Sequence, residues 1–222
     1  MTVLHLADEG EAADLAAFLS RLLHYDRGAS VRLQAAGTAL AVFGRPPSFE
    51  VLAIRAVRLA KPYENGLDVT LDVTVSAGEL LESVDDSAAT AVVPDAVTGP
   101  PWAGVLPPRG GWRPVPGLPA PDVLRAMVGS GVAEFRSRTQ ELAEERRTRA
   151  ELDRIGREIW SRTVGDTHLP VRAVHAAQSL GFLRATGELA LLSSGAWLRL
   201  RTPYGSIAVR RAGLGALDVS VR

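Results

Sequence analysis

The chain opens with a helical pattern of apolar residues. Leu15, Phe18, Leu19, Leu22 and Leu23 are spaced i, i+3, i+4, i+7 and i+8, which places them on one face of a helix. Acidic residues stand at the start of this segment, where they interact favourably with the helix dipole. The pattern therefore predicts a helix over residues 8–24 that buries one face.

Apolar runs of strand length follow this helix. Four runs bounded by Gly, Pro or Asn are expected to be strands: residues 29–35, 38–43, 51–59 and 67–76. The run 51–59 is apolar on both faces, which is typical of a central strand. Residues 67–75 alternate between apolar and polar, which predicts a half-exposed antiparallel strand. A short helix is expected over residues 77–84.

The middle of the chain is rich in proline. Of the 14 prolines, nine lie between residues 87 and 121. A segment of this length without regular structure is usually a linker or a functional loop. Trp102 and Trp112 would expose large apolar rings in a free linker, so we expect both to anchor the segment on the folded body.

Periodicity returns after residue 120. Helices are predicted over residues 121–137, 139–163 and 171–183. Strands are predicted at residues 189–193, 196–201, 206–210 and 216–221. The fold class is therefore α+β, with antiparallel sheets from the N- and C-terminal halves packed against an N-terminal helix and two or three central helices.

This pattern divides the chain into three parts. They are an N-terminal helix with an antiparallel sheet (1–86), a crossing loop (87–120) and a helical segment with β-hairpins (121–222). We expect the third part to pack with residues 1–86 as one unit. Residues 28–33 resemble residues 195–200, and each stretch precedes a Gly-containing turn. A helix–hairpin pseudo-repeat is one interpretation, and coincidence is the other.

Composition narrows the functional classes. Cysteine is absent, which excludes disulfides, thiolate catalysis, zinc fingers and iron–sulfur clusters. Lys61 is the only lysine among many arginines, a bias that we attribute to a GC-rich bacterial genome. No apolar run approaches the roughly 20 residues that span a bilayer, and the N-terminus lacks the basic region of a signal peptide. A soluble cytoplasmic protein is expected.

Motifs that carry chemistry are missing. The sequence has no Walker pattern, no G-x-G-x-x-G after a strand and no G-x-S-x-G. Asp68 and Asp72 share a strand face, but a rise of about 3.3 Å per residue separates their Cα atoms by ~13 Å. The histidines lack metal-ligand spacing: His5, His24, His168 and His175. We therefore expect no catalytic residue, no metal site and no cofactor, with a site assembled only by the fold left open.

The predicted helix 139–163 is rich in arginine and equally in acidic residues. Three i,i+4 pairs stand in the favourable order, each worth about 0.3–0.5 kcal/mol: Glu145–Arg149, Asp153–Arg157 and Glu158–Arg162. These pairs indicate a solvated, self-neutralised face and argue against a nucleic-acid surface on this helix.

The C-terminal hairpin carries aromatic and basic residues on one face. Alternation turns Trp197, Arg199 and Arg201 outward, together with Arg210 of the next strand. Such a face suits phosphate contact or base stacking. Alternatively, it is an ordinary exposed sheet face or a surface that faces the acidic middle segment of the chain. With residues of the crossing loop, it forms the predicted interaction surface: Trp102, Arg109, Trp112, Arg113, Trp197, Arg199, Arg201 and Arg210.

The function expected from these features is that of a non-enzymatic cytoplasmic adaptor that binds another protein. Nucleic-acid binding through the basic hairpin is one alternative, and an enzyme with a fold-assembled site is another. A homo-oligomer is also open, whereas a membrane partner is not expected. The order of elements is similar to that of secretion-associated chaperones of type VII systems, although no motif carries this likeness.

Overall fold

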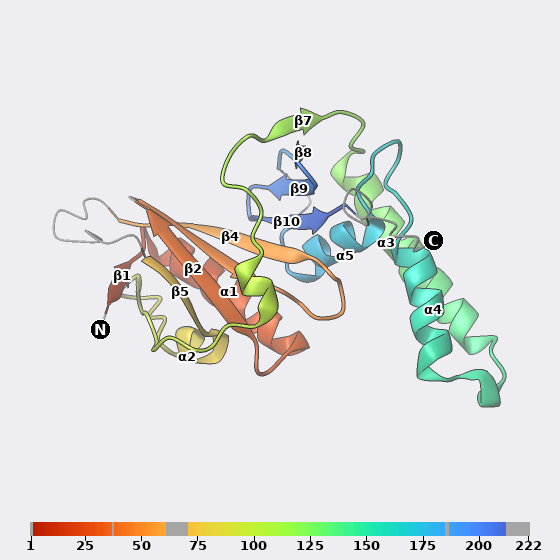
Figure 1. Cartoon of the computed structure of the whole chain (residues 1–222), viewed down its shortest axis with the longest axis horizontal. Coiled ribbons are helices and arrows are strands. Elements are labelled where there is room, and N and C mark those ends of the chain that lie inside the picture. The colour runs from red at the N-terminus through yellow and green to blue at the C-terminus, as the bar shows by residue number, and fades with distance from the viewer. Residues whose placement is uncertain (1, 37, 61–70, 185–186, 212–222) are drawn as a thin grey trace, which may run out of the picture.

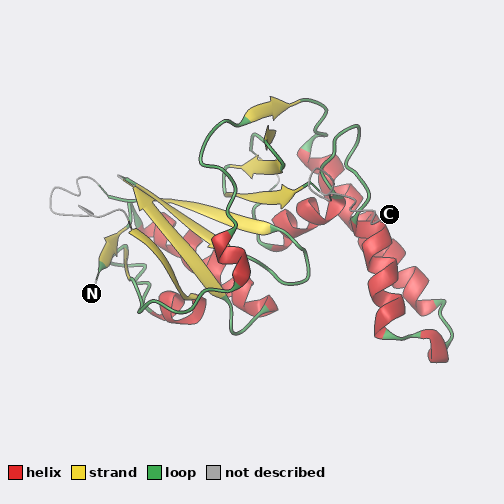
Figure 2. Cartoon of the chain, in the orientation of Figure 1, coloured by secondary structure: helices red, strands yellow, loops and turns green. Residues whose placement is uncertain are grey.

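The computed structural model describes residues 2–36, 38–60, 71–184 and 187–211. Within these residues the fold is α+β, as predicted (Figures 1 and 2). The helices are α1 (Glu9–Tyr25), α2 (Ala77–Glu82), α3 (Pro121–Gln140), α4 (Arg149–Trp160) and α5 (Val171–Ser179). The predicted strand 216–221, and residues 67–70 of another, lie outside the described residues. No helix in the described part of the chain is both long and apolar enough to cross a bilayer.

The strands form two antiparallel sheets. A small sheet pairs β1 (Val3–His5) with β6 (Thr90–Val92). The large sheet has the order β5-β2-β3-β4-β10-β9-β8-β7. Its strands are β2 (Ser30–Ala36), β3 (Ala39–Gly44), β4 (Leu52–Arg58), β5 (Leu71–Ser76), β7 (Arg113–Val115), β8 (Ala190–Ser194), β9 (Trp197–Thr202) and β10 (Gly205–Arg210).

The two halves of the chain share this large sheet. β4 of the N-terminal half pairs with β10 of the C-terminal half, with Ala53 opposite Ile207. The prediction of a central strand over residues 51–59 is therefore confirmed, because β4 lies in the middle of the sheet. A strand in this position is covered on both faces and needs apolar residues on both.

A helix followed by three consecutive strands occurs twice. The units are α1-β2-β3-β4 and α5-β8-β9-β10, and they meet at the β4–β10 pair. β3 and β9 thus hold equivalent positions on either side of this pair, as do β2 and β8. The sequence likeness between residues 28–33 and 195–200 does not follow this arrangement. It relates β2 to β9, whereas the equivalent of β2 in the sheet is β8.

The main core lies between one face of the large sheet, the inner face, and the helices. Leu15, Leu19 and Leu22 of α1 have 0% exposure, so the predicted apolar stripe is the buried face. Phe18 of α1 stacks on Phe182, which follows α5, with 5.6 Å between ring centroids. Residues from both halves therefore contribute to a single core.

A buried charge cluster also joins the two halves on the inner side. Arg55 of β4 is 5% exposed. Its guanidinium donates hydrogen bonds to Glu11 (3.2 Å) and Asp14 (3.1 Å) of α1, and to the carbonyl of Tyr204 (2.7 Å) in the β9–β10 turn. One side chain thus connects an N-terminal strand, an N-terminal helix and a C-terminal turn.

The crossing loop passes over the other face of the sheet, the outer face. β5 and β7 form the opposite edges of eight strands, and strand spacings of about 4.8 Å place these edges roughly 34 Å apart. Extended proline-rich chain rises about 3.1 Å per residue, so the loop is long enough to span them. Figure 1 shows it in yellow-green, running in front of the sheet through the 3-10 turn η1 (Pro101–Gly104).

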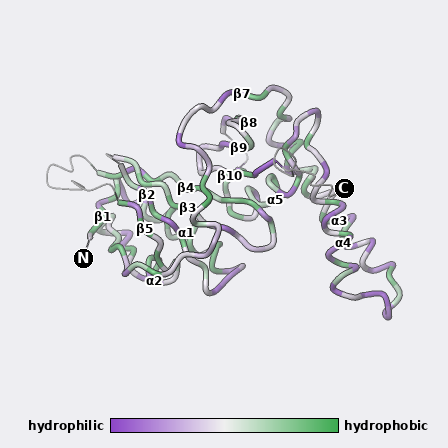
Figure 3. Tube along the Cα trace, viewed as in Figure 1, coloured by the Kyte–Doolittle hydropathy of each residue, from purple (hydrophilic) through white to green (hydrophobic). Residues whose placement is uncertain are grey.

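α3 and α4 form a helical hairpin that projects from the sheet, and its tip is mostly hydrophilic (Figures 1 and 3). The prediction of one helix over residues 139–163 is wrong, because α3 continues to Gln140 and α4 begins only at Arg149. Thr148 caps α4 by accepting a hydrogen bond from the amide of Glu151 at 3.3 Å. This Thr-x-x-Glu pattern is a helix-start signal that is readable in the sequence.

Ion pairs connect the two helices of the hairpin. Arg138 of α3 donates two hydrogen bonds of 2.9 Å to Glu158 of α4, and Arg162 bonds Glu134 of α3 at 2.5 and 2.7 Å. Three predicted pairs are not found among the described residues: Glu145–Arg149, Asp153–Arg157 and Glu158–Arg162. The charges are neutralised both across the hairpin, by these two pairs, and within α4, where Arg154 pairs with Glu151 and Glu158.

Aromatic side chains connect α4 to α5. Trp160 of α4 lies 4.3 Å from His175 of α5 between ring centroids. Phe49 meets the same imidazole edge-on at 5.0 Å. Burial lowers the pKa of His175, because the charged imidazolium is poorly solvated in this position.

This burial predicts a loss of stability in acid. Below about pH 6.5, the ordinary histidine pKa, the unfolded chain binds a proton at this position more readily than the native protein does. The contribution of His175 is therefore complete above that pH and declines as the pH falls toward its lowered native pKa. One proton limits this slope to about 1.4 kcal/mol per pH unit. Urea unfolding of wild type and His175→Phe at about pH 7.5 and about pH 5.5 should show a shallower decline in the variant, and equal declines would contradict the prediction.

Candidate functional site

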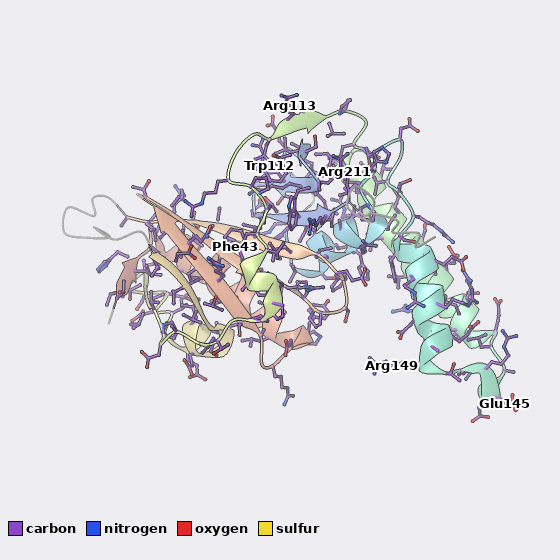
Figure 4. The ribbon with its side chains drawn as sticks, viewed as in Figure 1. Phe43, Trp112, Arg113, Glu145, Arg149 and Arg211 are labelled. Carbon is purple, nitrogen blue, oxygen red and sulfur yellow. The ribbon has the colours of Figure 1, made fainter. Side chains whose placement is uncertain are left out.

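The outer face of the large sheet carries a second apolar cluster. Phe43 of β3, Leu52 and Ile54 of β4, and Ala208 of β10 pack together and are at most 7% exposed. These residues occupy alternate strand positions and so point away from the helices. Figure 4 shows Phe43 on the sheet beside the η1 turn. The cluster is buried because part of the chain covers it.

The crossing loop provides this cover. Trp102 and Leu106 of the loop pack against the outer-face cluster, and Trp197 of β9 packs against it from the sheet. Trp102 and Trp197 come from different halves of the chain. Both were predicted to belong to the interaction surface, Trp102 as part of the crossing loop and Trp197 as part of the C-terminal hairpin. The β4–β10 pair places Trp197 within reach of the loop.

Polar contacts also dock the loop. The guanidinium of Arg32 on β2 donates a hydrogen bond to the carbonyl of Ala103. The same guanidinium pairs with Asp72 of β5, with 2.8 Å between Nε and Oδ1. The hydrogen bond from Arg32 lowers the pKa of Asp72, and Gln34 donates a further bond to it. These residues hold the loop near the β5 edge of the sheet.

A pocket of about 350 Å³, which we name the tryptophan pocket, opens between Trp102 and Trp197. Arg45, Glu50 and Arg210 also line it. Glu50 has a positive φ of 52°, a backbone conformation that is uncommon for a residue other than glycine. Aromatic walls with charged groups around them are typical of a surface that binds a partner.

A second hollow of about 260 Å³, the arginine pocket, lies farther along the loop and is lined by Arg109 and Arg199 among others. The guanidinium of Arg199 lies 5.7 Å from the ring centroid of Trp112, within the range of a cation–π contact. Trp112 in turn donates a hydrogen bond from Nε1 to the carbonyl of Pro108 at 3.0 Å. Burial lowers the pKa of Arg199, and the positive charge of Arg201 adds to this effect.

The structure thus brings most of the predicted surface together on one face. Trp112, Arg113 and Arg201 line neither pocket, although Trp112 contacts Arg199 at the arginine pocket. Arg113 is exposed at the start of β7, beside Trp112 in Figure 4, and Arg201 is exposed on β9 opposite Ser206. Sequence reasoning missed Arg45 and Glu50. No sequence pattern indicates the positive φ of Glu50, and Arg45 is the first residue after β3, in an irregular segment.

Comparison with known protein families gives two matches. Residues 1–104 match the model of a domain of unknown function (DUF8010), and residues 107–214 match that of a second domain of unknown function (DUF8185). The two matched ranges meet in the crossing loop. No curated protein matches the chain.

Proposed function

We propose that the protein is a non-enzymatic adaptor of the bacterial cytoplasm that binds another protein through the tryptophan pocket. The supporting observation is that Trp102 and Trp197, from the two halves, converge with Arg45 and Arg210 around an open pocket. Tryptophan and arginine are the residue types that most often dominate the binding energy of protein interfaces, especially where they frame a pocket.

The chemistry of the pocket favours a particular kind of partner segment. Its base includes Leu52 and Ala208, which suits an apolar side chain. Two arginines and one glutamate carry the charge of its lining, so the pocket has an excess of positive charge. Acidic residues beside the apolar anchor would be attracted to it and would set the orientation of the partner.

The arrangement of arginines supports a protein partner over nucleic acid. Arg199 is half-buried and lies beside Trp112. The exposed Arg201 and Arg210 are separated by four residue positions along the paired strands, which is about 13 Å. Nucleic-acid binding, an enzyme site assembled by the fold and self-association are alternatives that the following experiment separates.

The test places a photo-crosslinking benzoyl-phenylalanine at position 105. Val105 lines the tryptophan pocket and is 51% exposed. Val123 on α3 is 46% exposed and lies outside both pockets, so the same replacement there is a matched control. We expect crosslinks to a distinct host protein from position 105 and not from position 123.

The tryptophans provide the quantitative check. Trp102→Ala and Trp197→Ala should each weaken binding of the identified partner about 30-fold, as expected for residues worth roughly 2 kcal/mol. Arg113→Ala should leave it unchanged. Thermal melts of each variant verify folding. A nuclease-sensitive crosslinked species, a crosslink to a second copy of this chain, or tryptophan variants that bind normally would each count against the proposal.

A further inference from the structure

A larger cleft lies between the helical hairpin and the rest of the protein, on the other side of Glu50 from the tryptophan pocket. Its volume is about 830 Å³, within the range of sites that hold small organic ligands. α3, α4, α5, the end of α1 and the loop before β4 all contribute to it. We name it the helical cleft.

A continuous row of aromatic rings lines the helical cleft. Tyr25 contacts Phe49 edge-on at 5.3 Å, Phe49 contacts His175 at 5.0 Å, and His175 contacts Trp160 at 4.3 Å. The row therefore extends from the end of α1 to α4. Burial holds the pKa of His175 below its ordinary value, so this ring is neutral at pH 7 and adds no positive charge.

Two guanidinium groups and two carboxylates also line the cleft. The nearest approach of Arg172 to Glu50 is long, at 3.9 Å, and its buried Nε lacks a hydrogen-bond partner. Asp153 lies 3.9 Å from Arg149, which does not line the cleft. Arg157 forms no ion pair within the described ranges, although a pair with Asp153 was predicted. Both arginines therefore retain hydrogen-bonding capacity for an anion.

Gly156 keeps space open on the α4 side of the cleft. A Cβ at this position would lie 3.7 Å from Cε2 of Phe135 and 3.7 Å from Cδ1 of Trp160, which are ordinary van der Waals distances. A longer side chain would extend from there into the cavity.

We propose that the helical cleft binds a small planar aromatic molecule that bears one anionic group. The aromatic ring packs against Trp160 and Phe49, where offset or edge-on contacts are favourable. The anionic group accepts hydrogen bonds from Arg157 and Arg172, since guanidinium groups suit carboxylate and phosphate geometry. Glu50 lines both this cleft and the tryptophan pocket, but none of the residues changed in the test below lines the tryptophan pocket, so the test is independent of the adaptor proposal.

Isothermal titration calorimetry of the full chain tests the proposal with three probes. They are naphthalene-2-carboxylate, the uncharged 2-naphthalenemethanol and adenosine monophosphate. We expect saturable one-site binding of naphthalene-2-carboxylate, about tenfold or more tighter than that of the alcohol. Binding of adenosine monophosphate at the same site would identify a nucleotide as the source of the aromatic anion, and its absence would favour a carboxylate.

Two leucine substitutions serve as a matched pair. Gly156→Leu fills the cleft, and since leucine is a better helix former than glycine, loss of binding cannot be ascribed to unfolding of α4. Gly129→Leu makes the same change on α3, where a Cβ would have no neighbour within 4 Å. The first variant should weaken binding at least about tenfold and the second should not change it.

Charge removal completes the test. Arg157→Gln with Arg172→Gln should lower affinity for the carboxylate about tenfold and leave the alcohol unaffected. Absence of saturable binding of both anions to the folded wild type at millimolar concentration would overturn the proposal. Equal affinities for the carboxylate and the alcohol, or binding that survives Gly156→Leu, would also overturn it.

Discussion

Replacing Arg55 with alanine is expected to lower the free energy of unfolding by about 3–5 kcal/mol, the usual cost of removing one partner from a buried ion pair. Arg55 is 5% exposed and Glu11 is 9% exposed. Without the guanidinium, the carboxyl group of Glu11 stays in a poorly solvated position with one hydrogen-bond partner fewer. The carbonyl of Tyr204 also loses a donor at 2.7 Å.

Arg58 offers a control from the same strand with the same carboxylate partner. Its Nε lies 2.8 Å from Glu11, but its side chain is 71% exposed. Because water solvates this pair, Arg58→Ala should lower the free energy of unfolding far less than Arg55→Ala does. Urea denaturation of the full-length variants measures both effects. Similar losses for the two arginines would show that burial of Arg55 does not make its ion pairs important for stability.

Arg55 also connects the two halves of the chain. Its partners lie on α1 and in the β9–β10 turn, so the substitution weakens contacts within and between the halves. We therefore expect a single, shifted unfolding transition. Two separate transitions in Arg55→Ala would indicate that the halves unfold independently.

Elements with local signals were predictable from the sequence. The spacing of Leu15, Leu19 and Leu22 predicts α1 correctly, because it matches the period of a helix and all three residues lie on the buried face. The central position of β4 also follows from its pattern, since apolar residues on both faces require cover on both sides. The start of α4 was missed although Thr148 and Glu151 form a readable cap.

Features that depend on long-range pairing were not predictable. The β4–β10 pair joins strands from opposite halves, and no local signal selects one apolar strand as the partner of another. The same limitation applies to charges. Glu158 and Arg162 stand at helical spacing along one segment, yet they do not pair with each other: Arg162 pairs with Glu134 of α3, and Glu158 pairs with Arg138 of α3 as well as with Arg154 of α4.

The candidate site shows the same division. Alternation placed Trp197 and Arg199 on the outward side of β9, and the structure puts them on the outer face. These outward-pointing side chains are nevertheless only partly exposed. The crossing loop covers them, because it brings Trp112 beside Arg199 and Trp102 beside Trp197. Where the loop crosses depends on sheet order, since it must connect the β5 edge to the β7 edge.

Replacing Gly205 with alanine is expected to destabilise the protein by about 3 kcal/mol or more, through backbone strain and overpacking together. Gly205 begins β10 with a φ of 154°, a conformation that L side chains rarely adopt. A Cβ there would lie 2.6–2.7 Å from three atoms of the Phe182 ring.

That ring has little freedom to move away, because Phe182 is 3% exposed and stacks on Phe18 of the other half. Gly195 provides a reference for a glycine with a positive φ and no nearby side chain. It also has a positive φ, of 53°, but a Cβ there would meet nothing within 4 Å, so Gly195→Ala reports backbone strain alone, about 1 kcal/mol. The difference between the two variants in urea denaturation combines the clash with Phe182 and the greater strain of an L residue at a φ of 154°. Adding Phe182→Leu to Gly205→Ala should recover part of the loss, because the smaller side chain frees space for the new methyl group. Equal costs at positions 195 and 205 would mean that Phe182 yields without penalty and that its packing against Phe18 does not constrain the start of β10.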